Sequence, residues 1–209
     1  MGNDLAAERE KSIEHLKLGG FLKSGKVEKA MMAVPREEFV QDNERDCAYD
    51  DTPKGIGFSQ TISAPHMVAL MTELLELKKN DTVLEVGGGS GYQAAVLAKL
   101  VRQVYSIELE QGLVDFAEGN LKRAGIRGVE IIQGDGSKGL PEKAPFDKVI
   151  VACGCHDVPK PLFKQLEQGG ILVAPVGGSR MQYLKKYQKT SSGIRKESHG
   201  GCIFVPLRH

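Results

Sequence analysis

The sequence predicts an α/β fold in which a doubly wound, mostly parallel sheet is covered by helices. From Asp81 onward, short apolar strands alternate with helical stretches, which is typical of parallel βαβ units. These strands are almost entirely apolar, as expected for a sheet that is buried on both faces. The expected strands are 82–86, 104–107, 129–132, 148–152 and 171–176, and the expected helices are 92–101, 113–124 and 162–166.

The residues before this alternation predict an N-terminal helical extension. Helices are expected over 4–17, where Asp4 is a suitable N-cap, and over 27–33. Residues 40–62 lack periodicity and are expected to be irregular. A further helix is expected over 65–77, because it begins with a proline and apolar residues then recur at helical spacing.

The last part of the chain predicts an antiparallel pair of strands at the sheet edge. Residues 181–189 and 203–207 are strand-like, and a polar stretch separates them. The many basic side chains here are typical of a solvent-exposed edge strand. We therefore expect one domain, with an N-terminal extension over 1–65, an α/β core over 66–178 and edge strands over 179–209.

Composition excludes several classes of protein. Lys plus Arg is 28 and Asp plus Glu is 27, so the net charge of +1 lacks the basic balance of a nucleic-acid-binding protein. No apolar run is long enough to span a membrane, and the charged N-terminus does not resemble a signal peptide, so we expect a cytoplasmic protein. Cys153-Gly154-Cys155-His156 lacks a second pair of ligands, so we expect free thiols rather than a metal site.

Residues 83–92, Val-Leu-Glu-Val-Gly-Gly-Gly-Ser-Gly-Tyr, carry the strongest local signal. A strand delivers Glu85, and glycines then lead into a helix. Glycine permits a tight turn and lets a ligand approach the backbone, and such a turn holds a pyrophosphate in dinucleotide enzymes. Because the loop alone is weak evidence, a nicotinamide dehydrogenase is kept as a distant alternative.

Three carboxylates at the ends of consecutive strands narrow this choice. Glu108 stands where an acidic residue captures a ribose diol, and Asp135 could accept a hydrogen bond from an adenine amino group. For either residue alone, a helix cap or a solvated loop is the competing interpretation. Glu85 is poorly placed for an anionic pyrophosphate but well placed for a cofactor with a cationic amino group. This pattern favours S-adenosylmethionine and a methyltransferase.

Residues 57–68, Gly-Phe-Ser-Gln-Thr-Ile-Ser-Ala-Pro-His-Met-Val, strongly resemble the signature of protein-L-isoaspartate O-methyltransferases. The resemblance continues in order at 34–40, 83–92, 134–136, 165–170, 175–177 and 204–207. It implies a Rossmann-like methyltransferase fold, with S-adenosylmethionine as cofactor and S-adenosylhomocysteine as product. The implied reaction methylates the free α-carboxylate of L-isoaspartyl residues in damaged proteins or peptides, which starts their repair through a succinimide.

The resemblance also implies roles for particular residues. Thr61, Ile62 and Ser63 would form an active-site loop that contacts cofactor and substrate, with Ser63 and Thr61 as the catalytic candidates. Val205, Pro206 and Leu207 would bind the substrate backbone. The implied cofactor-binding residues are Glu85, Gly87, Gly88, Gly89, Gly91, Glu108, Leu109, Asp135 and Gly136. A substrate carboxylate is already ionised at neutral pH, so no general base is required, and His66 is interpreted as a structural histidine.

The chain departs from the family pattern at three places. Gly88 stands where Thr or Ser is common, and Leu109 follows Glu108 where Arg or His is frequent. Residues 152–159, Ala-Cys-Gly-Cys-His-Asp-Val-Pro, replace an Ala-Ala-Pro-like segment. Two alternatives therefore stay open: a methyltransferase for another acceptor, and a non-catalytic binder of cofactor or damaged peptides. Because the family is often monomeric, we expect a monomer.

Overall fold

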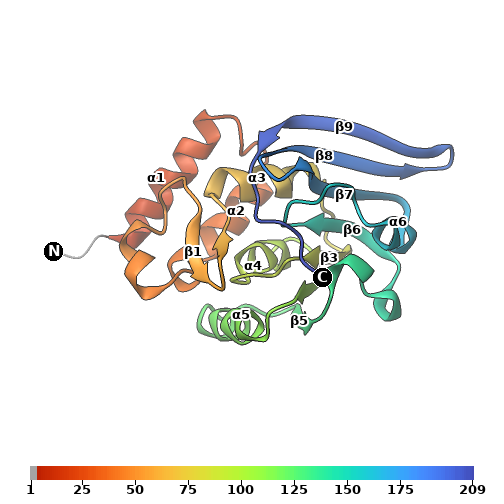
Figure 1. The fold of residues 1–209 in the computed structure, drawn as a ribbon. Helices are drawn as coiled ribbons and strands as arrows, with labels where there is room; N and C mark the ends of the chain where they lie inside the picture. Colours follow the sequence, from red (N-terminus) through yellow and green to blue (C-terminus); the bar gives the residue numbers. More distant parts are fainter. Residues whose placement is uncertain (1–3) are drawn as a thin grey trace.

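The computed structural model describes residues 4–209 and is built around a seven-stranded sheet in the order β5-β4-β3-β6-β7-β8-β9 (Figure 1). Five strands are parallel, and β8 and β9 join the edge in antiparallel pairing. The predicted doubly wound, mostly parallel sheet with an antiparallel edge is confirmed. The strands are β3 (Thr82–Val86), β4 (Gln103–Glu108), β5 (Val129–Gln133), β6 (Phe146–Val151), β7 (Leu166–Gly178), β8 (Met181–Thr190) and β9 (Gly193–Cys202).

The strand order places a ligand-binding crevice beside β3. The chain runs outward from β3 to β4 and β5, and then returns to β6 on the other side of β3. Neighbouring connections therefore leave in opposite directions at the carboxyl ends of β3 and β6, which is where open α/β sheets bind ligands. All five residues of β3 are buried, including Glu85.

Helices cover both faces of the sheet. On one face lie α3 (Pro65–Leu74), α4 (Tyr92–Ala98) and α5 (Gln111–Arg123), and on the other lies α6 (Lys160–Gln165). The clusters of buried side chains show this division, because Val83 and Ile150 pack with α3 and α4, whereas Leu84 and Val149 pack with α6. Short 3-10 helices are η1 (Arg36–Glu38), η2 (Asp42–Cys47), η3 (Gly136–Lys138) and η4 (Pro141–Lys143).

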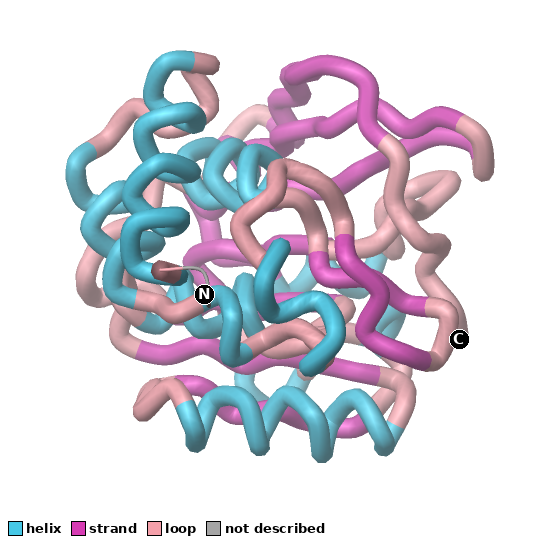
Figure 2. Tube along the Cα trace, turned by 90° about the vertical axis from the view of Figure 1, so that its left-hand side faces the viewer, coloured by secondary structure: helices cyan, strands magenta, loops and turns pink. Residues whose placement is uncertain are grey.

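The N-terminal residues form a helical layer against α3 and α4. Helix α1 (Leu5–Leu18) begins at Asp4, whose carboxylate accepts hydrogen bonds from the amides of Ala6 and Ala7, so the predicted cap is confirmed. Helix α2 (Gly25–Ala33) follows. Viewed from this side, these helices lie in front of the main sheet (Figure 2).

The prediction of an irregular stretch over 40–62 was partly wrong. This stretch contains a hairpin of β1 (Lys54–Gly57) and β2 (Gln60–Ile62). Its strands are very short, and its turn uses Phe58 and Ser59 in left-handed conformation, with φ of 52° and 57°. Hairpin turns of this kind usually carry Asn and Gly, so the sequence offered no recognisable turn signal.

The predicted partner of the 181–189 strand was also wrong. The antiparallel partner is β9 over 193–202, in the stretch that was interpreted as a polar connection, and only Ser191 and Ser192 separate it from β8. Because β9 is an exposed edge strand, it lacks the alternation of apolar residues by which a strand is recognised. Residues 203–207 form no strand and contribute a single bridge, between Pro206 and Gly154.

Candidate active site

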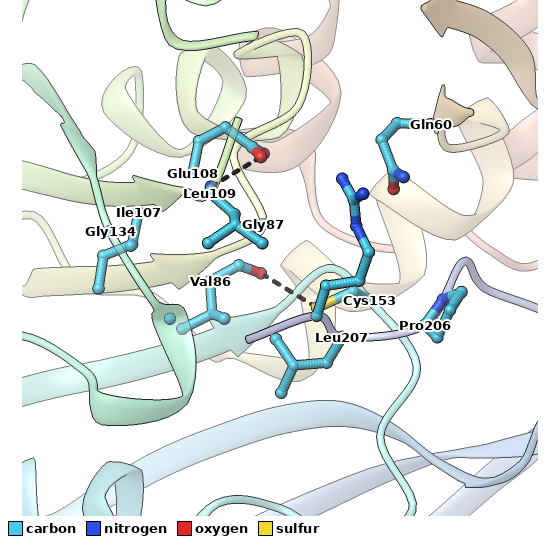
Figure 3. A pocket seen from close by; sticks show the side chains of 12 residues that line it. Gln60, Val86, Gly87, Ile107, Glu108, Leu109, Gly134, Cys153, Pro206 and Leu207 are labelled. Carbon is cyan, nitrogen blue, oxygen red and sulfur yellow. Dashed lines mark hydrogen bonds between the residues drawn. The ribbon is translucent and has the colours of Figure 1, made fainter. Parts of the chain in front are cut away.

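Two adjoining cavities open at the carboxyl ends of β3, β4 and β6. The first, the Glu108 cavity, is lined by Gln60, Val86, Gly87, Ile107, Glu108, Leu109, Gly134, Gly136, Cys153, Pro206, Leu207 and Arg208 (Figure 3). The second, the Glu85 cavity, is lined by Thr61, Ile62, Ser63, Val68, Glu85, Gly87, Gly88, Gly89, Ser90, Tyr92, Gln93 and Ala152. Gly87 lines both cavities, so they adjoin at this residue, and together they are called the crevice here.

The glycine loop shapes the floor of this crevice. Gly87 and Gly89 have φ of 92° and 54°, which favours glycine. A Cβ at Gly88 would lie 2.6 Å from the hydroxyl oxygen of Ser106 on β4. The loop therefore presents bare backbone to the crevice, and Ser106 occupies the space that a side chain at position 88 would need.

Glu85 is a buried carboxylate with one free oxygen. Its exposed fraction is 0%, one oxygen accepts a hydrogen bond from the Ser106 hydroxyl, and Oε1 has no partner among residues 4–209. Burial raises the pKa of Glu85 to about 8, because desolvation disfavours the charged form. A carboxylate of this kind, in a cavity wall, is suited to a cationic ligand group that would restore its charge.

Glu108 ties the end of β4 to the glycine loop. One carboxylate oxygen accepts from the Gly89 amide at 2.8 Å, and the other accepts from the amides of Leu109 at 2.8 Å and Glu110 at 3.1 Å. Three amide donors hold the carboxylate at the cavity wall. A carboxylate has about four acceptor positions, so capacity is left for ligand hydroxyls.

Two predicted cofactor-binding residues, Asp135 and Gly91, do not line either cavity. The Asp135 carboxylate caps η3, accepting from the amide and hydroxyl of Ser137 at 3.0 and 2.6 Å, and these hydrogen bonds lower its pKa. Gly134 and Gly136 line the Glu108 cavity, and Asp135 does not. Gly91 lines neither cavity and packs closely against Ala117 of α5.

Strand β2 and the residue that follows it bring Thr61, Ile62 and Ser63 to the Glu85 cavity. Thr61 and Ser63 also line a third cavity, the His66 cavity, together with Pro53, Ala64, His66, Met67 and residues 201–204. The Asp51 carboxylate accepts from the backbone amide of His66 and contacts its Nδ1, both at 2.9 Å. This pair anchors the start of α3, which supports the structural interpretation of His66.

Residues 205–208 cross the other side of the crevice. The Gly154 amide donates to the Val205 carbonyl, and the Leu207 amide donates to the Gly154 carbonyl, each at 2.8 Å. Pro206 and Leu207 line the Glu108 cavity, whereas Val205 does not. Arg208 forms an ion pair with Glu110 at 2.8 Å.

The unusual loop after β6 places two thiols in the interior. Cys153 and Cys155 are buried and free, and burial raises the pKa of Cys155 to about 11 and that of Cys153 well above its usual range. Both are thus protonated at neutral pH. In the part of the chain that the structure describes, no cluster of three or more His, Cys, Asp or Glu side chains could hold a metal ion.

The fold and the crevice together define an S-adenosylmethionine-dependent methyltransferase. The model of the family "Protein-L-isoaspartate(D-aspartate) O-methyltransferase (PCMT)" matches residues 7–209, and the chain belongs to this family. Isoaspartyl O-methylation with S-adenosylmethionine is therefore its activity. The predicted family, fold, enzyme class and cofactor are confirmed.

Relatives and solved structures agree along the chain. It is 52% identical to the protein-L-isoaspartate O-methyltransferase of Methanopyrus kandleri, over 95% of this chain and 90% of that protein. It is 46% identical to that of Pyrococcus horikoshii, over 98% and 94%. A solved protein-L-isoaspartate O-methyltransferase superposes with a TM-score of 0.86 at 32% identity, covering 96% of this chain and 66% of that one.

A second solved structure is similar to this chain over nearly its whole length. It is a Plasmodium falciparum beta-aspartate methyltransferase (PCMT) in complex with S-adenosyl-L-homocysteine, with a TM-score of 0.85 at 28% identity over 96% of this chain and 98% of that one. Within residues 4–209, no helix is both long and apolar enough to cross a membrane.

Sequence reasoning missed several residues of this site. Gln60, Ile107, Gly134, Cys153 and Arg208 line the Glu108 cavity. Gly134 and Ile107 adjoin predicted residues, so their place at strand ends was a usable signal. Gln60 and Arg208 also adjoin predicted residues, Thr61 and Leu207, but the sequence does not indicate that these two segments lie beside the same cavity.

Proposed function

We propose that the crevice holds the cofactor lengthwise, with the methionine part in the Glu85 cavity and the adenosine part in the Glu108 cavity. The residues fit such a ligand. The free Oε1 of Glu85 suits an ammonium group, the amide-anchored Glu108 suits ribose hydroxyls, and Ile107 and Leu109 suit an adenine ring. When bound, the cofactor supplies a methyl group on a positively charged sulfur.

Ser63 and Thr61 orient the acceptor carboxylate in this proposal. Their position in the wall of the Glu85 cavity supports it. A carboxylate with an ordinary pKa of about 3.3–3.9 is ionised at neutral pH, so the protein needs to remove no proton. Hydroxyl donors hold the anion in line with the methyl group and do not bind it as tightly as a cation would, which keeps the ground state from being over-stabilised.

The substrate chain passes between two segments. Residues 61–63 bind the isoaspartyl carboxylate, and Val205, Pro206 and Leu207 bind the neighbouring backbone. The two hydrogen bonds between the Gly154 backbone and residues 205–207 support this, because they fix that segment beside the crevice. The methyl ester of the α-carboxylate then loses methanol as the following backbone nitrogen attacks it, and the resulting succinimide hydrolyses in part to normal aspartate.

The placement of Ser63 in the same cavity as the free oxygen of Glu85 carries this proposal. We expect Ser63→Ala to lower turnover on an isoaspartyl peptide by about tenfold or more, as for the loss of about 1.4 kcal/mol of transition-state stabilisation. Cofactor affinity, measured by calorimetry, should change little. Unchanged turnover would remove Ser63 from the mechanism.

Matched peptides separate the acceptors. With labelled S-adenosylmethionine, a peptide containing L-isoaspartate should be methylated and its L-aspartate counterpart should not. Binding of the cofactor without labelling of the isoaspartyl peptide would contradict the proposed site and point to the residues 152–159 as the source of a different acceptor preference.

The protein is also proposed to act as a cytoplasmic monomer with a single domain. The N-terminal helical layer and the α/β core share one cluster of buried apolar side chains, in which Leu16, Val27 and Phe39 pack with Val96 and Leu113. Such continuity supports joint folding. Light scattering of the purified protein measures the oligomeric state.

A further inference from the structure

Arg36 is a fully buried cation without an acidic partner. Its exposed fraction is 0%, and it forms no ion pair with any residue that the structure describes. Nε donates to the Ala48 carbonyl at 2.7 Å, and Nη2 donates to the Ser63 carbonyl at 2.8 Å. Nη1 has no hydrogen-bond partner within residues 4–209. The guanidinium carbon lies 4.9 Å from the centre of the Tyr92 ring.

This arrangement is unfavourable for folding alone. Removing a charge from water without an ion pair is expensive, and two carbonyl acceptors and a ring face recover only part of that loss. Burial accordingly lowers the pKa of Arg36, although a guanidinium stays protonated. Asp51 is the acidic residue whose charge acts on Arg36, but its carboxylate is hydrogen-bonded to His66 and not to the guanidinium.

Arg9 in the same layer shows the usual solution. Its side chain is 18% exposed, it pairs with Glu37 at 2.9 Å, and it also donates to Tyr49 and to the Met32 carbonyl. The charge of Arg9 is therefore balanced by a carboxylate, and its donors have acceptors. Arg36 differs because its guanidinium forms no ion pair with any carboxylate among residues 4–209.

Arg36 lies directly behind the wall of the Glu85 cavity, where the acceptor carboxylate is proposed to bind. Ser63 and Tyr92 both line the Glu85 cavity, and Arg36 contacts both of them from behind. Among residues 4–209, the lining of this cavity includes no Lys, Arg or His. An acceptor carboxylate there would meet neutral hydroxyls directly, with a positive charge one layer further back. Charges act over such distances in an interior from which water is excluded.

We propose that Arg36 is a positioning residue for the acceptor carboxylate. Its guanidinium holds the Ser63 carbonyl and thereby fixes the direction of the Ser63 side chain, and its unpaired charge favours an anion in the Glu85 cavity. The inference rests on the proposed role of Ser63. The cofactor carries both positive and negative groups, so its affinity depends much less on this charge than that of the acceptor does.

The test compares Arg36→Gln with Arg9→Gln. Arg36→Gln should raise KM for the isoaspartyl peptide by about tenfold or more, while the cofactor Kd changes by less than about threefold. Arg9→Gln, the matched control, should lower the melting temperature but leave KM nearly unchanged. If both variants only lower the melting temperature, Arg36 is merely structural and the proposal is wrong.

Arg36→Lys provides a second measurement in case Arg36→Gln does not fold. It keeps a positive charge but cannot donate to both carbonyls in the same geometry. We expect KM to rise by less than about threefold over that of the wild type, while kcat falls because Ser63 is less well fixed. A wild-type kcat with a raised KM, or no change in either, would contradict the proposal. Activity of the wild type on the same peptide separates failure of this inference from failure of the proposed function.

Discussion

Glu85, Gly88 and Ser106 form a small unit in which one residue compensates for another. The Ser106 hydroxyl donates to Glu85 and fills the space beside Gly88. A hydroxyl residue is common in the family at position 88, where this chain has glycine. The Ser106 hydroxyl, on the neighbouring strand, therefore lies in the space that a side chain at position 88 would enter.

This compensation predicts coupling between positions 88 and 106. Gly88→Ser alone should destabilise the protein, because its Cβ would lie 2.6 Å from the Ser106 oxygen. Ser106→Ala alone removes a donor from a buried carboxylate. The double variant relieves the clash and restores a hydroxyl, so it should lose less stability than the sum of the single changes, by about 1–2 kcal/mol. A double-mutant cycle in chemical denaturation measures this, and simple additivity would argue against it.

The β1–β2 hairpin contacts the start of α5 near the Glu108 cavity, which the hairpin residue Gln60 lines. Phe58, at the hairpin turn, is 54% exposed, yet its ring lies directly over Gly112 of α5. A Cβ at Gly112 would lie 2.3 Å from that ring. On the other side, Arg208 reaches Glu110, which precedes α5. The hairpin and the C-terminal segment thus both contact residues 110–112, and both line the cavity, through Gln60 and Arg208.

Substitution of Gly112 should separate helix stability from ligand binding. Gly112→Ala favours the helix by up to about 1 kcal/mol, but it displaces Phe58 and loosens the hairpin. We expect an equal or higher melting temperature and a cofactor Kd that is raised about threefold to tenfold. Gly119→Ala, on the same helix and away from the hairpin, is the control: it should gain stability and keep the wild-type Kd. Equal Kd values for both variants would show that the contact does not matter.

The success of sequence analysis differed between elements for physical reasons. Strand β3 was predicted with its observed bounds, because a strand buried on both faces is mostly apolar and this one lies between turn residues. The β1–β2 hairpin and β9 were missed, since one is too short and the other too exposed to show periodicity. Glu85 and Glu108 could be placed from strand ends. Arg36 lies within the resembling stretch 34–40, but its proposed role could not be predicted, because its contacts with Ala48 and Ser63 join segments that are separate in the sequence.

At the scale of the whole molecule, the binding site lowers the stability of the protein that carries it. Glu85 is buried with a free oxygen, and Arg36 is buried without an ion pair among residues 4–209. The rest of the fold offsets the stability that is lost at such a site. Here, three clusters of buried apolar side chains connect the layers of the protein. Ligand binding should recover part of that loss.

Glu85 makes this loss depend on pH. The unfolded chain releases the Glu85 proton near the ordinary pKa of 4.5, whereas the native protein without ligand keeps it up to about 8. Between these values the native state binds the extra proton, so stability falls as pH rises. Glu85→Gln cannot titrate, so its stability relative to the wild type should increase from pH 4.5 to 8, while cofactor affinity falls about tenfold or more. Thermal unfolding without cofactor at several pH values, together with calorimetry, checks both; parallel pH curves would be inconsistent with a buried, titrating Glu85.

The exposed strand β9 affects how this enzyme interacts with other protein chains. It is one of the two edge strands of the main sheet, and it carries Arg195, Lys196 and Glu197 and a left-handed Gly200. Charged side chains and irregular backbone discourage an edge strand from pairing with foreign chains. Damaged proteins expose unpaired segments, and an enzyme that acts on them risks being caught in their aggregates. We expect the charged edge strand to let the enzyme release such substrates without adding their strands to its sheet.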